Sequence, residues 1–464
     1  MNRQAVINVV GLCDRHIGPN MPFTQAMKNS GQRAFIKPAF PAVTCTAQSN
    51  YLTGKTASIH GIVGNGWYNR ELAEVQFWKQ PNQLVQAPKI WDTLRATNPE
   101  FTCAKVFWWF NMYSNADWSI SPRPMYPADG RKIPDIYTSP ANIRMQITKD
   151  LGEFPFYGFW GPAAGRNTSK GPADCASRWI AESAIWIEKN HSPTLSLVYL
   201  PHLDYNLQRV GPHDQSIGTD LQLIDNIIRD LVTTYENRGV DPILISEYGI
   251  TESNKPIHLN QIFREQGWLK VRDELDLELL DAGASKAFAV ADHQVAHIYV
   301  NDTHIKNDVR MRLETLDGVS EIMDIDGKKE IGINHPRAGD FIAISDENAW
   351  FTYYYWMDED RAPDFARTVD IHRKPGYDPA ELFIDPSIRF PKTRIATRFL
   401  QKKLGFRMLM DVIPLDPTLV KGSHGCIPKN RADWPVLIAG KNAPLHSCEI
   451  SSIDIHDIIV NSLG

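Results

Sequence analysis

The stretch AVINVVGL, residues 5–12, decides the fold class. Its apolar residues follow one another without alternating with polar ones, and most are β-branched, which is typical of a parallel strand covered on both faces. We therefore expect a buried strand at Val6–Leu12. Further short runs of the same kind predict strands at Ala104–Trp108, Leu195–Leu200, Pro242–Ser246, Ala287–Val290, Ala296–Val300 and Asp340–Ile344.

Helical patterns lie between several of these strands. Asp174–Lys189 and Thr219–Asn237 carry apolar residues at helical spacing, with Asp174 and Thr219 as expected N-caps, and Ser452–Ser462 predicts a last short helix. Strands that alternate with helices predict an α/β fold with three layers, α/β/α, around a mostly parallel central sheet.

Two stretches break this alternation. Residues 109–173 are rich in Trp, Tyr, Pro, Gly and Asn, and residues 345–415 are rich in aromatic and charged residues. We interpret both as insertions that cap the edge of the sheet, within a single domain spanning residues 1–464. The aromatic run Phe107–Tyr113 can either hold a flat ring of a ligand or pack the first insertion onto the core, whereas Trp350–Trp356 is expected to pack.

Composition excludes several classes of protein. The chain has 464 residues, a formal net charge of −5 and 43% hydrophobic residues, so a strongly basic surface for a nucleic-acid polymer is not expected. No apolar run is long enough to cross a membrane, and no membrane partner is expected. Six cysteines without a CxxC pair, and a first apolar run too short for a signal peptide, favour a cytoplasmic location. The oligomeric state stays open.

Acidic residues follow three of the predicted strands. Asp14 comes after the first strand, Asp204 after Leu195–Leu200, and Glu247 after Pro242–Ser246. Because ligands bind at the carboxyl edge of such sheets, three acids at this edge predict a site for a divalent cation.

The most specific segment lies between the first two strands. It reads FPAVTCTAQSNYLTG at residues 40–54, followed by SIHGIVGN at residues 58–65. A threonine in the first turn of a helix sits in the helix's positive field, which favours an alkoxide and an anionic phosphoryl group. Thr44 and Thr46 both stand near the start of this expected helix, and helix capping is the alternative role for Thr44.

These motifs resemble the alkaline phosphatase superfamily, in its type I phosphodiesterase/nucleotide pyrophosphatase and phosphonoacetate hydrolase branch. The order of a threonine, a Thr-Gly, a His-Gly-Ile and an asparagine matches that branch. The resemblance implies an alkaline phosphatase-like fold, Thr44 as nucleophile with Thr46 as its rival, and Asn65 as a donor to a phosphoryl oxygen. It also implies metal ligands at Asp14, Thr44, Asp204 and, within the Gly-Ser-His-Gly of residues 422–425, His424.

Three positions depart from the family's pattern. Gln208 stands where the family has histidine, and Glu247-Tyr248 stands where it has Asp-His. Three interpretations stay open. Gln208, Glu247 and Tyr248 could themselves bind two metals. One metal could remain, held by Asp14, Thr44 and Glu247 or by Asp204 and His424. Other histidines could replace the missing ones, the candidates being His202, His213, His293 and His372. Zinc follows from the resemblance, while the loss of imidazoles favours manganese or magnesium.

The predicted function is metal-dependent hydrolysis of phosphate esters, above all phosphodiester or pyrophosphate bonds, through a phospho-threonine intermediate on Thr44. The cofactors expected are two divalent metal ions, and the partner is a small phosphorylated substrate that includes nucleotide-like ones. A phosphonate hydrolase or a phosphomonoesterase, with Lys374 near the phosphate, is the nearest alternative. A metal-poor, non-catalytic binding protein is the alternative from another class.

Overall fold

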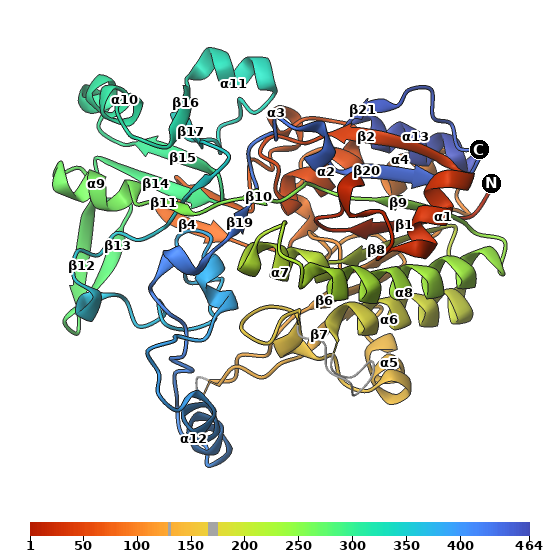
Figure 1. The fold of residues 1–464 in the computed structure, drawn as a ribbon, viewed down its shortest axis with the longest axis horizontal. Helices are drawn as coiled ribbons and strands as arrows, with labels where there is room; N and C mark the ends of the chain where they lie inside the picture. The colour runs from red at the N-terminus through yellow and green to blue at the C-terminus, as the bar shows by residue number, and fades with distance from the viewer. Residues whose placement is uncertain (129–130, 166–174) are drawn as a thin grey trace.

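The computed structural model describes residues 1–128, 131–165 and 175–464. Its central sheet has nine strands in the order β21-β2-β20-β9-β1-β8-β5-β6-β7 (Figure 1). In its middle, β1 (Gln4–Val9) pairs in parallel with β8 (Leu195–Leu200) and β9 (Asp241–Ile245). Every residue of β1 and β8 is buried, which explains why their sequences do not alternate between apolar and polar.

The sheet is mostly parallel around β1 and mixed at its margins. On one side β5 (Cys103–Val106) and β6 (Trp118–Pro122) continue the parallel order, and β7 (Ile136–Ser139) closes it antiparallel. The other side holds β20 (Val436–Ala439), β2 (Gln32–Lys37) and β21 (Glu449–Ser451). Because β6 and β7 fall within residues 109–173, this stretch widens the main sheet as well as covering its edge.

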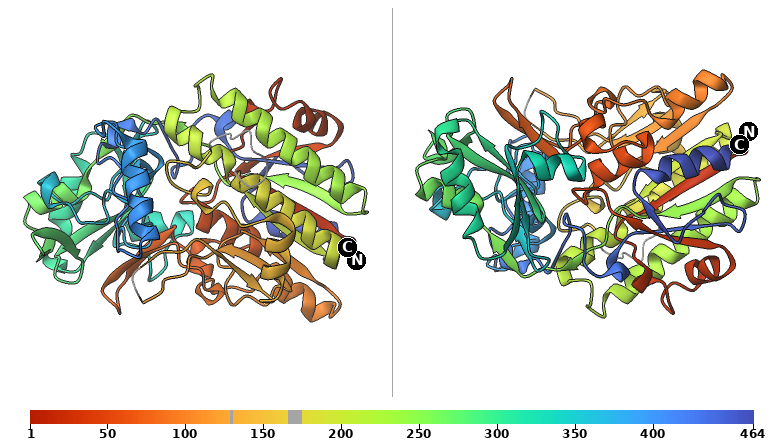
Figure 2. Two further views of the ribbon diagram at one scale, coloured as in Figure 1. Left: turned by 90° about the horizontal axis from the view of Figure 1, so that it is seen from below. Right: turned by 90° about the horizontal axis from the view of Figure 1, so that it is seen from above.

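Helices cover both faces of the sheet, so the predicted α/β/α layering is confirmed (Figure 2). On one face lie α6 (Ala176–His191) and α8 (Ile217–Glu236), and on the other α2 (Thr44–Thr53), α4 (Ile90–Thr97) and α13 (Asp454–Leu463). The N-cap prediction for Thr219 is wrong, since α8 begins at Ile217 after Ser216 and Thr219 is its third residue. The other predicted cap, Asp174, lies outside the described residues.

A second sheet forms a separate lobe, which we call the cap lobe. It is antiparallel, in the order β14 (Ala287–Asp292), β15 (Val295–Val300), β17 (Phe341–Ser345) and β16 (Val319–Met323), and it has its own hydrophobic core. The strands predicted at 287–290, 296–300 and 340–344 therefore exist, but not in the central sheet. Their sequences look alike because this sheet too is buried on both faces.

The chain crosses between the main body and the cap lobe at one pair of short strands. The chain leaves the body at β10 (Thr251–Glu252) and returns at β19 (Gly422–Ser423), and these strands pair with each other. The segment that builds the cap lobe thus begins near residue 251, well before the insertion predicted to begin at residue 345. The aromatic run Trp350–Trp356 packs inside the cap lobe, as expected.

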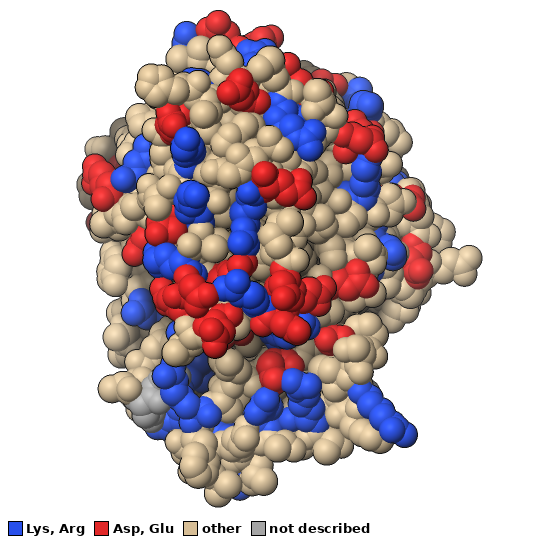
Figure 3. All heavy atoms as spheres, turned by 90° about the vertical axis from the view of Figure 1, so that its left-hand side faces the viewer, with Lys and Arg blue, Asp and Glu red and all other residues tan. Residues whose placement is uncertain are grey.

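The outer side of the cap lobe carries intermixed charges. Figure 3 shows a band of Asp and Glu side chains with Lys and Arg among them. On β12 (Lys270–Glu274), which pairs with β13 (Leu277–Asp281), Arg272 is paired with Glu274 and Asp273 with Arg361.

Short elements complete the described chain. They are α1 (Pro22–Ser30), α3 (Ala57–His60), β3 (Gly66–Asn69), β4 (Glu74–Phe77), α5 (Ile143–Leu151), α7 (His202–Val210), β11 (Lys255–Ile257), α9 (Leu259–Glu265), α10 (Lys306–Glu314), α11 (Ile325–Ile331), β18 (Ala349–Phe351) and α12 (Pro391–Lys403). None of the helices in the described ranges is long and apolar enough to cross a bilayer. The cytoplasmic location stays a prediction.

Candidate functional site

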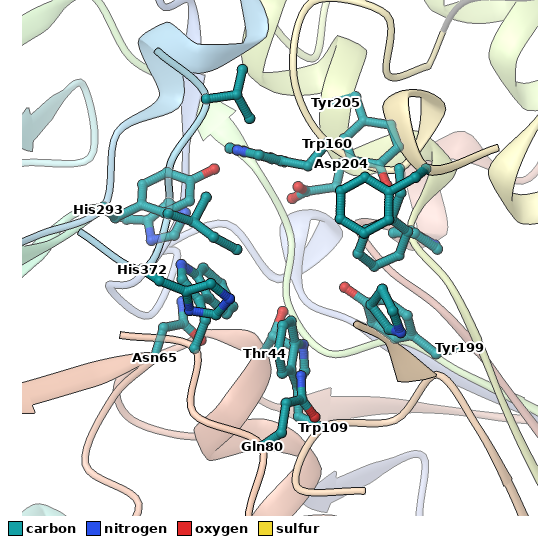
Figure 4. A pocket seen from close by; sticks show the side chains of 18 of the residues that line it. Thr44, Asn65, Gln80, Trp109, Trp160, Tyr199, Asp204, Tyr205, His293 and His372 are labelled. Carbon is teal, nitrogen blue, oxygen red and sulfur yellow. The ribbon is translucent and has the colours of Figure 1, made fainter. Parts of the chain in front are cut away.

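A cavity of about 950 Å³, counting the space open to solvent, lies where the carboxyl ends of the central strands meet the cap lobe (Figure 4). One end of it is polar and the rest is mostly aromatic. The polar end is lined by Thr44, Asn65, Asp204, Tyr248, His293 and His424. The main body and the cap lobe thus contribute to one site. Sequence analysis had named all six of these residues as candidates, His293 among them as a replacement ligand.

Thr44 is the first residue of α2, and its side chain lies at the bottom of the cavity, only 3% exposed. The next backbone amide, of Cys45, donates to Asn65 Oδ1 over 3.1 Å, so Asn65 is fixed against the same helix end. The rival nucleophile Thr46 is fully buried and donates its hydroxyl to the Ile62 carbonyl at 3.1 Å, away from the cavity. The geometry therefore favours Thr44.

A chain of hydrogen bonds connects Thr44 to a carboxyl group. The Thr44 Oγ1 and Tyr248 Oη atoms are 3.2 Å apart, and Tyr248 donates to Asp204 Oδ1 at 3.1 Å. A tyrosine hydroxyl has one proton, so a Tyr248 that donates to Asp204 accepts from Thr44. This direction leaves the lone pairs of Thr44 free to face a substrate.

Gln208 continues this chain instead of acting as an open ligand. One turn along α7 from Asp204, its Nε2 donates to Asp204 Oδ2 at 2.9 Å, and its Oε1 accepts from the Tyr377 hydroxyl at 2.9 Å. Burial raises the pKa of Asp204 to about 7, against the hydrogen bonds from Tyr248 and Gln208 that lower it. Both polar ends of Gln208 are thus engaged by the protein.

Asn65 is positioned by Asp292, which sequence analysis missed. The Asn65 backbone amide donates to Asp292 Oδ2 at 2.7 Å and its Nδ2 to Asp292 Oδ1 at 3.1 Å. Since Nδ2 carries two hydrogens, one is left for a ligand. Asp292 ends β14 beside His293, and the Asp-His pair at a strand end was the available signal. Burial raises the pKa of Asp292 to about 6.

His424 and His293 present two imidazole nitrogens without partners. His424 Nδ1 is 2.7 Å from the Ala42 carbonyl, so it carries the proton, and Nε2 keeps its lone pair. His293 Nδ1 is likewise bound to Asp292 Oδ1 at 2.8 Å. Both Nε2 atoms are buried and lack a partner among the described residues. Burial lowers the pKa of both rings well below the ordinary value, so both are neutral acceptors.

Glu247 lies behind Thr44 rather than in the cavity. Its Oε1 accepts from Asn8 Nδ2 at 2.5 Å and from Gln48 Nε2 at 2.6 Å. Burial raises the pKa of Glu247 to about 8, although the hydrogen bonds from Gln48 and Asn8 lower it. Both donors hold this carboxyl group behind Thr44, and it does not line the cavity.

The structure places Asp14 outside the cavity. Its carboxylate accepts Lys28 and Arg33 at 2.6 Å each, on a partly exposed surface, and it does not line the cavity. The reason is the register of the first strand, because β1 ends at Val9 and the next residue, Val10, is a fully buried hydrophobe. Asp14 begins a short 3-10 helix, beyond the strand's end.

Among the four histidines proposed as replacements, only His293 reaches the polar cluster. His202 Nε2 is bound to Asp220 Oδ1 at 2.8 Å, and exposed His213 does not line the cavity. His372 lines the cavity, with its Nδ1 3.5 Å from the Phe77 carbonyl. Lys374 does not line the cavity. Its Nζ is bound in the interior by Asp378 at 2.7 Å and by Glu381 at 2.8 Å.

These donors do not fit a two-metal centre. Within the described ranges no three His, Cys, Asp or Glu side chains converge as metal ligands. One pair remains, Asp204 Oδ1 and His424 Nε2, 3.9 Å apart. Tyr248 and Gln208, where the resemblance would place imidazoles, hydrogen-bond to Asp204 instead. The groups available for chemistry are therefore hydroxyls, carboxyls and neutral imidazoles.

Aromatic side chains form the remaining wall of the cavity. The rings of Trp78 and Trp109 are 4.9 Å apart, and Trp160 lies 5.7 Å from Tyr377 and 6.2 Å from Tyr205. Trp109 thus faces the ligand space, while its neighbour in the sequence, Trp108, is fully buried in the core. Both roles considered for the run Phe107–Tyr113 therefore occur in it: Trp109 faces the space for a ligand, and Trp108 packs in the core.

Residues 5–378 match the model of the type I phosphodiesterase/nucleotide pyrophosphatase family. The chain belongs to this family. The match confirms the branch of the alkaline phosphatase superfamily indicated by the motifs, and the family and its structural neighbours are phosphodiesterase, pyrophosphatase and phosphonate hydrolases. Members of this family are metal-dependent, but the match does not fix a metal or a number of metal ions for this chain.

Individual relatives are distant. An uncharacterized pyrophosphatase/phosphodiesterase of Schizosaccharomyces pombe is 23% identical over 240 residues, which is 49% of this chain and 41% of that protein. This chain therefore aligns with less than half of the curated relative. Two solved structures share the fold over 100% of this chain. They are murine ectonucleotide pyrophosphatase/phosphodiesterase 5, an inactive threonine-to-alanine variant with AMP (13% identity, 95% of that chain, TM-score 0.59), and Sinorhizobium meliloti phosphonoacetate hydrolase with phosphonoformate (12%, 96%, 0.60).

Proposed function

We propose that this protein hydrolyses phosphate esters, preferring phosphodiester or pyrophosphate bonds, with Thr44 as the nucleophile. The observation that carries this proposal is the placement of Thr44, at the first position of α2, on the cavity floor and hydrogen-bonded toward a carboxyl group through Tyr248. The murine relative whose threonine-to-alanine variant is inactive supports a threonine in this role.

In the first step, Thr44 Oγ1 attacks phosphorus and the bond to the leaving oxygen breaks. The Thr44 proton passes to Tyr248 while the proton of Tyr248 passes to Asp204 Oδ1, along the hydrogen bonds already present. The leaving oxygen takes up a proton from solvent. The product of this step is a phosphorylated Thr44 and a free alcohol or phosphate.

The charge that develops on phosphorus is stabilised by fixed donors. The first-turn amides of α2 supply a positive field, and Asn65 keeps one Nδ2 hydrogen free because Asp292 and the Cys45 amide hold the rest of its side chain in place. Donors that are already oriented need no rearrangement in the transition state.

In the second step, water attacks the phosphorylated Thr44 and the Oγ1–P bond breaks. The proton held on Asp204 returns through Tyr248 to Thr44 Oγ1. The attacking water gives its proton to His424 Nε2, which is neutral and unpartnered in the described structure, and from there to solvent. The net reaction adds one water across one P–O bond.

The charge of the cavity favours phosphodiesters over phosphomonoesters and phosphonates. Among the described residues that line it, Lys132 is the only lysine or arginine. A phosphomonoester carries about two negative charges, and a phosphonate with a carboxylate carries more, whereas a diester carries one. Lys374, which the monoesterase alternative needed, is neutralised by two carboxylates.

A non-catalytic binding protein remains the second candidate, because the donor set lacks the expected imidazoles. We propose that hydrolysis by the wild type requires neither a pair of zinc ions nor a pair of manganese ions. We also propose that the main body and the cap lobe work as one unit, since residues of both line the cavity.

The test is hydrolysis of bis(4-nitrophenyl) phosphate by wild type, Thr44→Ala and Thr46→Ala, each with chelator and with added zinc, manganese or magnesium. Thr46→Ala is the matched control, from the same helix but outside the cavity. We expect activity in wild type and Thr46→Ala and none in Thr44→Ala. Full activity in Thr44→Ala would rule out the nucleophile, and an inactive wild type under every condition would favour the binding protein.

A further inference from the structure

Helix α12 and the segment after it differ in charge from the rest of the chain. Residues 389–409 read RFPKTRIATRFLQKKLGFRML, with seven lysines or arginines and no acidic residue, in a protein of net charge −5. Of the seven cations, Arg394 and Arg398 pair with Asp411, and none of the others has an ion pair with a described residue. The segment is therefore a local positive patch.

The same segment exposes large apolar side chains. No residue of α12 is buried, and Leu404 and Phe406 just after it are 65% and 64% exposed. Single exposed hydrophobes are common on protein surfaces, but a group of them marks an interaction site. The exposed apolar residues within these 21 positions are Phe390, Phe399, Leu400, Leu404, Phe406 and Leu409.

The helix is attached to the protein by one side only. Ile395 packs on a small cluster that includes Val412 and Ile413, and Asp411 binds the two arginines next to it. Figure 1 shows α12 projecting below the body, and the view from below in Figure 2 shows it facing the viewer. Its outward side is thus free of the described protein.

This helix lies at the mouth of the cavity. Lys402 Nζ donates to the Lys132 carbonyl at 2.9 Å, and Lys132 lines the cavity. The Phe399 ring is 6.0 Å from that of Tyr157, whose neighbour Phe156 also lines the cavity. A surface that binds α12 would therefore lie against the entrance to the site.

We propose that α12 and the segment to Leu409 dock on an anionic lipid surface, with the apolar side chains entering the interface and the cations meeting the headgroups. Cations beside exposed hydrophobes on one helix are the pattern of interfacial binding, and each cation near an anionic leaflet adds to it. Thirteen helical residues are too few to cross a bilayer, so the helix lies on the surface. A symmetric contact with a second copy would bring two such positive patches together, which like-charge repulsion opposes.

This docking also bears on the substrate, and that consequence rests on the function proposed above. The aromatic wall made by Trp78, Trp109 and Trp160 is mostly apolar ring surface, with Trp160 Nε1 taken by Glu381 and Trp109 Nε1 without a partner among the described residues. Such a wall suits a hydrocarbon group on the ester oxygen. The substrate class is therefore a phosphodiester with a long apolar group, taken from the membrane.

Vesicle flotation of the full chain tests docking without any need for catalysis. Vesicles of phosphatidylcholine alone are compared with vesicles containing about a third phosphatidylserine. We expect about tenfold stronger partitioning onto the anionic vesicles, reversed by high salt, and about a tenfold loss in both Leu404→Ser/Phe406→Ser and Lys392→Glu/Lys403→Glu. Matched controls are Leu275→Ser, at a 95% exposed position on the cap lobe, and Lys270→Glu.

Equal partitioning onto neutral and anionic vesicles, or unchanged binding in both double variants, would overturn the docking proposal. So would a wild-type dimer that Leu404→Ser/Phe406→Ser converts to monomer, because α12 would then cover a second copy. Thr44→Ala is expected to float like wild type. Flotation therefore tests docking alone, and the hydrolysis of bis(4-nitrophenyl) phosphate tests the proposed function alone.

For the substrate class, 4-nitrophenyl phosphodiesters with a methyl or a dodecyl group as the second ester are compared in solution. We expect a KM about tenfold lower for the dodecyl ester, from the burial of its hydrocarbon chain. Equal KM values for the two esters would overturn the apolar substrate class while leaving docking to stand on flotation.

Discussion

Replacing the buried acid Glu247 by glutamine is expected to stabilise the protein at alkaline pH. Glutamine keeps an Oε1 that accepts from Asn8 and Gln48, and its new amide nitrogen takes the place of Oε2, which has no partner among the described residues and lies beside the Thr44 hydroxyl. The change therefore removes an ionisable proton while leaving the local hydrogen bonds intact.

The size of the effect follows from the pKa of Glu247, which burial raises from 4.5 to about 8 in the folded protein. Between these values the folded state holds a proton that the unfolded chain has lost, so wild-type stability falls as pH rises through this window. At about 1.4 kcal/mol per pH unit, the full loss is about 5 kcal/mol above pH 8. For a chain of 464 residues this corresponds to about 5 °C in the unfolding temperature.

The assay is thermal unfolding of wild type and Glu247→Gln across this pH range, with Glu71→Gln on the exposed surface as the control. The variant's unfolding temperature should equal that of wild type near pH 4.5 and exceed it by several degrees near pH 8. Two results would refute a protonated Glu247. The difference in unfolding temperature between the variant and wild type could stay constant with pH, or the variant could lose ground to wild type between pH 5 and pH 8.

Three further predictions test other parts of the site. Tyr248→Phe breaks the path from Thr44 to Asp204 and should lower kcat about 100-fold with little change in KM. Tyr354→Phe, in the cap-lobe core and with a hydroxyl that has no partner among the described residues, should leave kcat within about twofold. Asp14→Ala removes a surface ion pair with Lys28 and Arg33, so kcat/KM should stay the same and stability should drop by at most about 1 kcal/mol; a large loss of activity would restore Asp14 to the site. Removal of divalent ions with a chelator should leave hydrolysis within about twofold, since the donors do not fit a metal pair, and loss of activity restored by zinc would contradict this.

Sequence patterns located the residues that stand directly at the ends of strands or at the start of a helix. Thr44, Asp204 and His424 were carried over from the motifs of the family resemblance, and all three line the cavity. Asp14 was misplaced because an apolar run does not tell where its strand ends, and β1 ends five residues earlier, at Val9.

The remaining parts of the site depend on contacts between distant segments. Asp292 reaches Asn65 only because the cap lobe folds back over the main body through the pairing of β10 with β19. The cap sheet itself could not be separated from the central sheet by its sequence, since buried antiparallel and buried parallel strands have the same unbroken apolar pattern.

The most direct test of Thr44 as the nucleophile is to stop the reaction with acid during turnover and examine the peptide that contains Thr44 by mass spectrometry. We predict a phosphoryl group on Thr44 that appears with substrate, disappears as substrate is exhausted, and is absent in Thr44→Ala. Hydrolysis at the full rate without any phosphorylated Thr44 peptide, together with an active Thr44→Ala variant, would contradict the proposed mechanism.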